Sequence, residues 1–209
     1  MKGMMIKDFF MIKNNYKSLI IALVIYVFYS FMFDMNMAFF LPFMGLMICI
    51  STLNYDEYNN WHTYASSLPQ GRVNVVKSKY YISIAVVAIL FIFSILLSVL
   101  FSMMRPNVEY DMSISYFMGE VVAIIFMMSV LFPILFKYGS EKGRLAMIII
   151  GLSVYGIVLA VTKLIPTKPP VELLQFLDKY SIPIFGVLSI VLLIGSYAIS
   201  KKVYLKKEF

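Results

Sequence analysis

Apolar residues form six long runs along the chain, and short polar segments separate them. A helix that crosses the hydrocarbon core of a bilayer, roughly 30 Å thick, needs about 20 apolar residues. Each run is close to that length, so the pattern predicts six membrane-spanning helices, at residues 18–33, 35–53, 80–104, 114–136, 145–165 and 182–199. Asp34, Asn36 and then Pro42 interrupt the first long apolar stretch, and we expect a tight hairpin between its two spans.

The composition agrees with this pattern. Hydrophobic residues make up 61% of the 209 residues and charged residues only 14%, whereas soluble domains are about 45–50% apolar and about 25% charged. The formal net charge is +7, which in a soluble protein would raise the question of nucleic acid. Here the basic residues flank the apolar runs, so membrane topology explains them and we expect no nucleic-acid partner.

Lys and Arg residues are distributed unevenly between the two sides that six spans define. One side has fourteen of them: Lys2, Lys7, Lys13, Lys17, Arg72, Lys77, Lys79, Lys137, Lys142, Arg144, Lys201, Lys202, Lys206 and Lys207. The other side has four: Arg105, Lys163, Lys168 and Lys179. The positive-inside rule places both termini in the cytoplasm. The sequence therefore predicts an all-α integral membrane protein with a single domain over residues 1–209.

The segment before the first span predicts a helix that lies on the inner leaflet. At the angular spacing of an α-helix, Met5, Phe9, Ile12 and Tyr16 fall on one stripe. The lysines of this segment lie away from that stripe, as in helices that rest in the membrane interface. The alternative is a frayed tail whose lysines only fix the orientation of the chain.

The longest segment on the outer side, residues 166–181, predicts a second short helix. It begins with prolines, and Leu173, Phe176, Leu177 and Tyr180 then follow at helical spacing. We expect this outer helix, between the fifth and sixth spans, to lie at the outer membrane surface.

The longest cytoplasmic segment, residues 54–79, predicts a short amphipathic helix between the second and third spans. On a helix, Tyr55, Tyr58, Trp61, His62 and Ala65 share one face. The sequence Leu-Pro-Gln-Gly at 68–71 ends it, because Pro and Gly favour turns. Such a helix can take a push from a soluble partner and pass it to both spans. Alternatively, it rests on lipid headgroups through its aromatic residues.

The chain offers little for catalysis. His62 is the only histidine and Cys49 the only cysteine, so a zinc motif built from several Cys and His ligands cannot form. The phosphate-binding sequence G-x-x-x-x-G-K-[ST] is absent, so we expect no ATP hydrolysis by such a loop in this chain.

Glu120 is the one acidic residue clearly inside a predicted span. A carboxylate within the membrane is costly and suggests a functional site by default. Glu120 could line a substrate path or pair with a neighbouring chain. Equally, it could lie close enough to the headgroups to be hydrated, or be held neutral.

The cytoplasmic segment also resembles that of a known family, the small ABC type-2 exporter permeases. The pattern is Asp-Glu followed by Trp and Tyr, then Ser-Leu-Pro, a nearby Arg, and Val-x-x-x-Lys-Tyr. It is carried by Asp56, Glu57, Trp61, Tyr64, Ser67, Leu68, Pro69, Arg72, Val75, Lys79 and Tyr80. The family usually has a β-branched residue and Ser before this Arg, where the chain has Gln70 and Gly71. The layout of six spans, an N-terminal interfacial helix and an outer helix extends the resemblance over essentially the whole chain.

The resemblance implies a subunit that works with partners. Two permeases, identical or homologous, would associate with two separate ATPase subunits that bind ATP and Mg²⁺, so this chain would be no enzyme and would hold no cofactor or metal. The segment between the second and third spans would dock into a groove of the ATPase. The implied docking and coupling residues are Asp56, Glu57, Trp61, His62, Tyr64, Ser67, Leu68, Pro69 and Arg72.

More narrowly, the chain is similar to permeases that export phenol-soluble modulins, which are small amphipathic cytolytic peptides. This predicts export of amphipathic peptides or similar membrane-active compounds across a bacterial plasma membrane. The alternative is a membrane protein without transport, in a structural, sensory or immunity role. An ATPase gene beside this one would separate the two hypotheses.

Overall fold

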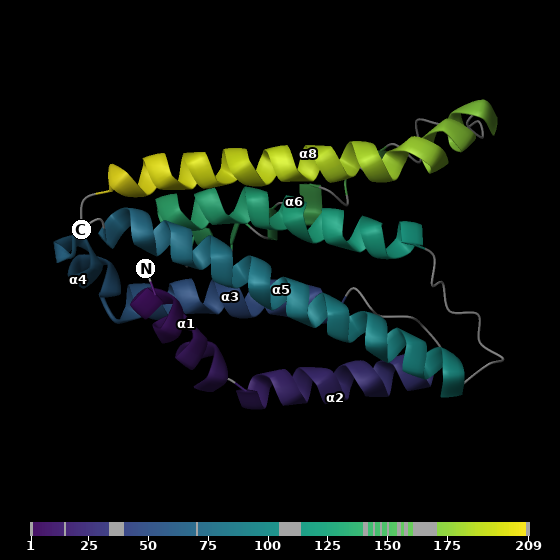
Figure 1. Cartoon of the computed structure of the whole chain (residues 1–209), viewed down its shortest axis with the longest axis horizontal. Coiled ribbons are helices and arrows are strands. Elements are labelled where there is room, and N and C mark those ends of the chain that lie inside the picture. Colours follow the sequence, from purple (N-terminus) through teal and green to yellow (C-terminus); the bar gives the residue numbers. More distant parts are fainter. Residues whose placement is uncertain are drawn as a thin grey trace.

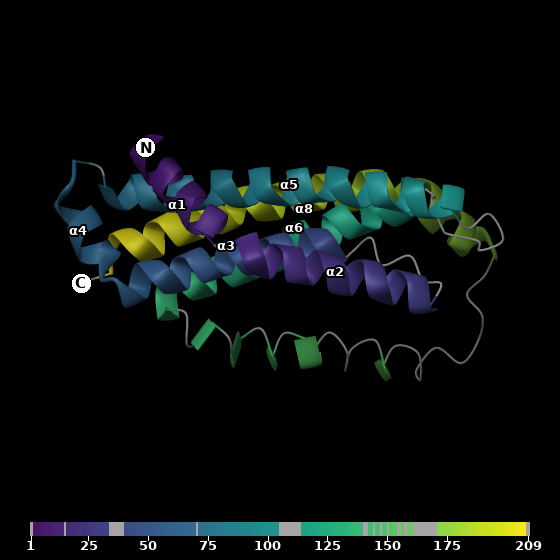
Figure 2. The same ribbon diagram turned by 90° about the horizontal axis from the view of Figure 1, so that it is seen from below.

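The computed structural model shows a bundle of long helices that run along a common direction (Figure 1). It describes residues 2–14, 16–33, 40–69, 71–104, 114–139 and 171–207, and short stretches between 142 and 160. The helices are α1 (Lys2–Asn14), α2 (Tyr16–Phe33), α3 (Phe40–Tyr58), α4 (Trp61–Ser67), α5 (Gly71–Met104), α6 (Ile114–Tyr138) and α8 (Val171–Leu205). Both termini and α4 lie at one end of the bundle, which we call the α4 end (Figures 1 and 2).

The helices follow the predicted spans, and α2 and α6 agree with them most closely. Within the described residues, three helical stretches are long and apolar enough to cross a membrane: Gly71–Met104, Phe117–Tyr138 and Gly186–Leu205. Most of the predicted fifth span, and the predicted hairpin between the first two spans, lie outside the described residues. The all-helical class is confirmed for the part of the chain that the structure describes.

The connection between α3 and α5 is much shorter than the predicted cytoplasmic loop of residues 54–79. Helix α3 continues to Tyr58 and α5 begins at Gly71, so both helices enter this segment. The prediction of one amphipathic face through Tyr58 and Trp61 is wrong, because the helix breaks between them. Asn60 at the break has a φ of 52°, a left-handed conformation that Asn adopts more readily than most residues.

Helix α1 is present as predicted, but its surfaces differ from the predicted stripe. Its buried residues are Met4 and Asp8, so this face packs on the bundle. Phe9 is 62% exposed, in agreement with a membrane-facing position. Tyr16, which the stripe included, instead begins α2.

The predicted outer helix and sixth span are one continuous helix. Helix α8 begins at Val171, directly after two prolines, and runs to Leu205. The prediction of a helix here is confirmed, but its separation from the sixth span is wrong. In Figure 1 the first part of α8 bends away from the rest. The sequence has Pro183 in this part of the helix, and a proline in a helix interior removes a hydrogen bond and usually kinks the helix.

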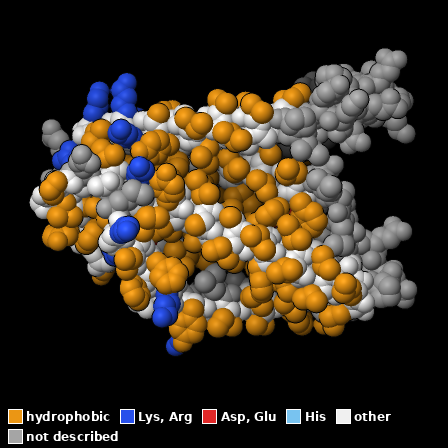
Figure 3. Space-filling model, in the orientation of Figure 1, with side chains coloured by type: hydrophobic (Ala, Val, Ile, Leu, Met, Phe, Trp, Pro, Cys, Tyr) orange, Lys and Arg blue, Asp and Glu red, His pale blue; other side chains and the backbone are white. Residues whose placement is uncertain are grey.

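Side chains are distributed as in a membrane protein. In Figure 3, hydrophobic side chains cover most of the visible face, while Lys and Arg gather at the α4 end. The core cluster of buried side chains draws on α1, α3, α4, α5, α6 and α8 together. Leu46, Val76 and Phe132 are fully buried in it, and Ala65 of α4 is 1% exposed. The core therefore joins α4 to several long helices at once.

Candidate functional site around helix α4

Helix α4 is joined to α5 by a tight turn. The amide of Leu68 donates to the carbonyl of Ala65 (3.3 Å), and the amide of Gly71 donates to the carbonyl of Leu68 (2.9 Å). A Cβ atom on Gly71 would lie 1.7 Å from the Ala65 carbonyl oxygen, so only glycine fits there. Leu68 and Pro69, from the Leu-Pro-Gln-Gly sequence expected to end the helix, lie in this turn. The close packing fixes the position of α4 relative to the start of α5.

Four charged side chains meet on one side of α4, and we call them the charge cluster: Lys7 and Asp8 of α1, Asp56 of α3 and Lys79 of α5. The Lys79 Nζ lies 2.8 Å from Asp8 Oδ1 and 2.7 Å from Asp56 Oδ2. The Lys7 Nζ pairs with Asp56 and lies 3.3 Å from Asp8 Oδ1. Three of the side chains are almost completely buried, and Lys7 is 23% exposed. Two positive and two negative charges balance, which such burial requires.

Two further contacts extend the cluster. The Lys79 Nζ donates to the carbonyl and the hydroxyl of Thr52 on α3, at 3.3 and 3.0 Å. The Lys7 Nζ lies over the ring of Trp61, 4.3 Å from its centroid, which is a cation–π contact. The cluster therefore joins α1, α3, α4 and α5 at one point.

On its other side, α4 contacts the last turn of α8. The His62 Nδ1 and the Tyr204 hydroxyl are 2.6 Å apart and hydrogen-bonded, and the two rings meet edge to face. Burial lowers the pKa of His62 below its usual value of 6.5, and the nearby Asp56 carboxylate acts in the opposite direction. The neutral imidazole is therefore the favoured form in this contact.

Arg72, in the first turn of α5, adds a second connection to α8. Its Nε donates to the Ser66 hydroxyl of α4 (3.3 Å), and its Nη1 donates to the carbonyl of Leu205 (3.0 Å). A cation at the carboxyl end of a helix also interacts favourably with the helix dipole. Arg72 thus links three helices: α4, α5 and α8.

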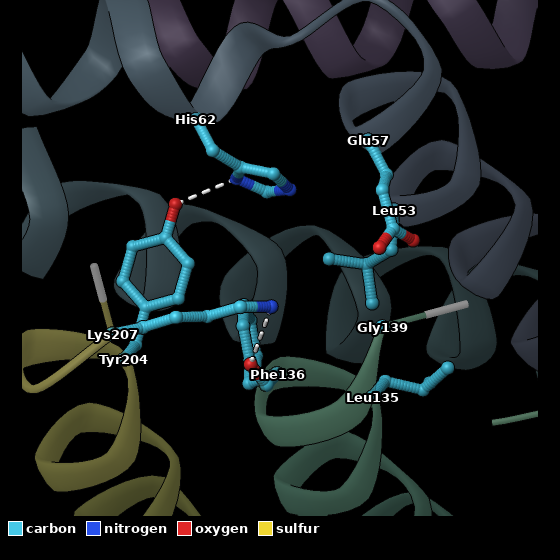
Figure 4. A pocket seen from close by; sticks show the side chains of 8 residues that line it. All are labelled: Leu53, Glu57, His62, Leu135, Phe136, Gly139, Tyr204 and Lys207. Atoms are coloured by element: carbon cyan, nitrogen blue, oxygen red, sulfur yellow. Dashed lines mark hydrogen bonds between the residues drawn. The ribbon is translucent and has the colours of Figure 1, made fainter. Parts of the chain in front are cut away.

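A small pocket lies between α3, α4, α6, α8 and the residues that follow α8 (Figure 4). Glu57, His62 and Lys207 reach it from different elements, and the Lys207 Nζ donates to the carbonyl of Phe136 (3.4 Å). The enclosed volume is about 10 Å³, enough for about one water molecule. The pocket is a small gap where helices pack together, and it is too small for a substrate.

Gly139 ends α6 against Glu57. Its φ of 84° lies in the region that favours glycine, and its amide donates to the carbonyl of Leu135 (2.9 Å). A Cβ atom here would lie 2.3 Å from Glu57 Oε1. The end of α6 is therefore fitted closely to the end of α3.

The structure divides the predicted docking residues into two groups. Asp56 is 1% exposed, and Trp61, His62 and Arg72 are half-buried against neighbouring helices. The exposed group is Glu57, Tyr64, Ser67, Leu68 and Pro69. The first group holds α4 in place, and only the second is open to a partner.

Sequence reasoning gave several residues of this site no docking or coupling role, although Tyr58 and Lys79 were part of the patterns that it described. Tyr58 is 86% exposed, beside the turn that precedes α4. Asp8, Lys79 and Tyr204 lie in the contacts described above. Asp8 had a signal in the sequence, because it is the only acidic residue among the lysines before the first predicted span. Nothing in the sequence indicated that Tyr204 would contact α4.

Glu120 is separate from these contacts. It lies near the start of α6, whereas the end of this helix belongs to the α4 end. Glu120 is 5% exposed. In the part of the chain that the structure describes, no group of three or more His, Cys, Asp or Glu residues could hold a metal ion.

Comparison with known protein families gives a match that covers nearly the whole chain. The model of a family described as "ABC-2 family transporter protein" matches residues 3–205. No curated protein and no solved structure matches.

Proposed function

Because the chain belongs to the ABC-2 family of transporter proteins, we propose that it is the permease subunit of an ABC exporter. Two copies, or this chain and a homologue, would form the path through the membrane. Two separate ATPase subunits would bind ATP and Mg²⁺ and drive export. The chain itself would have no catalytic residue and no cofactor.

The observation that supports this function best is how α4 is held. On one side, Trp61 contacts Lys7 of the charge cluster. On the other, His62 and Arg72 connect α4 and its neighbouring turn to the end of α8. A displacement of α4 would therefore be passed to α1, α5 and α8 together. This is what a helix that couples a soluble ATPase to a membrane path needs.

The surface of this end offers a place for the ATPase, which we call the docking face: Glu57, Tyr58, Thr63, Tyr64, Ser67, Leu68 and Pro69. Tyr58 and Tyr64 are 86% and 58% exposed at the end of the bundle where Lys and Arg gather. Aromatic residues often dominate the energy of protein interfaces. We assign docking to these exposed residues, and coupling to the partly or fully buried Asp56, Trp61, His62 and Arg72.

The substrate class in this proposal is amphipathic peptides or similar membrane-active compounds, of which phenol-soluble modulins are the narrower example. Such molecules partition into the inner leaflet and can enter a permease from the side. Membrane entry suits a bundle whose surface carries exposed Val24, Ile92 and Ile194 on three different helices. The proposed location is the plasma membrane of a bacterium, as the resemblance to exporter permeases implies. The distribution of Lys and Arg supports an orientation with both termini in the cytoplasm.

Co-purification and a transport assay test the proposed function. Purified in mild detergent from its own cells, the permease should retain an ABC ATPase subunit. The complex in liposomes should move a fluorescent amphipathic peptide across the membrane only with hydrolysable ATP. A chain that repeatedly purifies without any ATPase, or transport that does not depend on ATP, would contradict the proposal.

A further inference from the structure

The role proposed for α4 leaves helix α2 unexplained. The described side chains of α2 are all exposed or half-buried, and none of them belongs to the hydrophobic core cluster. Val24 and Phe28, for example, are 59% and 56% exposed. A span that packs so loosely on its own bundle leaves apolar surface that another molecule can cover.

An apolar groove lies between α2 and the two helices next to it, α3 and α5. It is lined by Ile20 and Leu23 of α2, by Leu41 and Met44 of α3, and by α5 between Ile89 and Leu96. Its volume is about 460 Å³, within the range of about 300–1,000 Å³ that ligand sites usually have. A Cβ atom on Gly45 would lie 2.7 Å from Cδ1 of Leu90, so α3 and α5 pack closely beside it. The side chains that line the groove are all apolar and suit a hydrocarbon chain.

Two lysines lie at the start of α2, next to this groove. Lys17 comes three residues before Ile20 on α2, so the two side chains are neighbours on the helix surface. Lys13 is in the last turn of α1, and Figure 3 shows basic side chains at the lower left, where α1 meets α2 in Figure 1. Both lysines are exposed, and neither forms an ion pair among the described residues. The sequence has no acidic residue between Asp8 and Asp34, so this positive charge is not balanced locally.

The surroundings place the two lysines at the level of lipid headgroups. Ile6, Phe9 and Phe10 of α1 are 55%, 62% and 55% exposed, as in a helix whose apolar side chains enter the membrane interface. With both termini in the cytoplasm, the start of α2 lies at the inner leaflet. At 1.5 Å per residue, Leu23 is about 9 Å further along α2 than Lys17. The groove therefore extends from the headgroup level into the hydrocarbon of the inner leaflet.

We propose that the groove between α2, α3 and α5 binds a phospholipid with a negatively charged headgroup from the inner leaflet. One acyl chain lies in the groove, and Lys13 and Lys17 bind the headgroup. A second copy of the permease fits less well, because a two-fold interface would bring the same unbalanced lysines of both copies together. The site goes beyond the export function and requires only a membrane location with this orientation.

Native mass spectrometry of the full-length permease in mild detergent, with any subunit that it retains, measures the binding. Each bound lipid adds a resolved mass. The probes are phosphatidylglycerol and phosphatidylcholine with identical acyl chains, so that the two lipids differ in headgroup charge. The double variant Lys13→Gln with Lys17→Gln removes the proposed headgroup contacts. The matched control, Lys2→Gln with Lys202→Gln, removes two other exposed lysines.

Two further variants test the groove itself. Ile89→Trp fills part of the groove, and Leu100→Trp adds the same side chain to α5 at a position that does not line it. Ile89 and Leu100 are 65% and 53% exposed, so neither substitution should disturb the core.

The wild type should bind the first molecule of phosphatidylglycerol at least about tenfold more tightly than phosphatidylcholine, since two lysines near an anionic headgroup contribute that much together. The Lys13→Gln and Lys17→Gln double variant should lose this preference, while the Lys2→Gln and Lys202→Gln control should keep it. Ile89→Trp should weaken the binding of both lipids at this site, and Leu100→Trp should not.

Equal affinity of the wild type for the two lipids would overturn the proposal. So would a preference that persists without Lys13 and Lys17, or lipid binding that Ile89→Trp leaves unchanged. A permease dimer that Ile89→Trp splits and Leu100→Trp does not would assign the groove to a second copy, and would also overturn it. The lysine variants test the headgroup contacts even where a groove variant fails to fold. A permease that retains no ATPase would contradict the export function and leave this test intact.

Discussion

The Nζ atom of Lys79 on α5 lies 2.7 Å from Oδ2 of Asp56 on α3, and both side chains are almost completely buried. Asp56 also pairs with Lys7, whose ammonium group lies over the Trp61 ring of α4. The carboxylate that sequence resemblance assigned to a partner interface therefore holds the permease together internally. Its contribution to coupling, in this account, is to keep α4 attached to α1, α3 and α5.

Replacement of Lys79 should destabilise the protein. Lys79→Met leaves Asp8 and Asp56 with only Lys7 between them, and breaking a buried ion pair costs about 3–5 kcal/mol. The thermal unfolding midpoint in detergent should fall clearly. The double variant Asp56→Asn with Lys79→Met restores the charge balance and should recover part of the loss.

Lys77→Met is the control for that experiment. Lys77 is on the same helix but contacts only the Tyr81 ring among the interactions described, at 5.9 Å. We expect little change in the unfolding midpoint. Equal effects at positions 77 and 79 would show that the charge cluster contributes no special stability.

The contact of His62 with Tyr204 should make stability depend on pH. Burial lowers the pKa of His62 below 6.5 in the folded protein. The unfolded chain takes up a proton at about pH 6.5, so below that pH it binds more protons than the folded chain, and stability falls. The unfolding midpoint of the wild type should decrease from about pH 7.5 to 5.5 more steeply than that of His62→Gln. Parallel curves would contradict this role of His62.

Gly139→Ala should disturb the contact of α6 with α3. The residue has a φ of 84° and a Cβ atom would lie 2.3 Å from Glu57 Oε1. We expect the free energy of unfolding to fall by roughly 1 kcal/mol or more from backbone strain alone, as for other alanines at positive φ. Adding Glu57→Ala should relieve the clash but not the strain. Gly195→Ala, where no atom lies within 4 Å of the added Cβ, is the control. A Gly139→Ala variant as stable as this control would contradict the described fit.

Different substitutions should impair ATPase docking and the coupling of ATP hydrolysis to transport separately. Tyr58→Ser should weaken binding of the ATPase by roughly 2 kcal/mol, about 30-fold, if it is an interface anchor. Its unfolding midpoint should stay unchanged, because the side chain is 86% exposed. Arg72→Gln should leave the ATPase bound but reduce the transport obtained per ATP hydrolysed. Titration of labelled ATPase onto nanodiscs measures the first effect, and transport assays in liposomes the second.

Tyr16→Ser is the matched control for docking, since Tyr16 is 52% exposed at the start of α2. It should not alter ATPase binding. If Tyr58→Ser binds the ATPase as tightly as Tyr16→Ser does, Tyr58 is not an anchor of the interface.

Much of the fold could be predicted because it depends on local composition. Apolar runs of membrane-spanning length gave helices where the structure has them, and the ends of α2 and α6 were nearly right. The break at Asn60 was not predicted. An Asn can adopt either a helical or a left-handed conformation, and the surrounding contacts decide between them.

The site was predictable only in outline. The importance of the segment around Trp61 followed from its pattern, but the partners of its residues did not. His62 and Tyr204 are 142 positions apart, and Lys79 and Asp8 are 71 apart. Such pairings depend on how the helices pack in three dimensions, which periodicity along one helix does not contain. For the same reason, the burial of Asp56 could not be distinguished in advance from an exposed docking role.

The central claim is that the exposed side of α4 contacts an ABC ATPase, and photo-cross-linking tests it most directly. A benzophenone amino acid is introduced at Tyr64 of α4 or at Tyr81 of α5, which are exposed to similar extents, 58% and 51%. After illumination of membranes, an adduct of the permease with the ATPase should form from position 64, with a yield that changes when ATP is added, and not from position 81. No ATPase adduct from position 64, or equal adducts from both positions, would contradict the account.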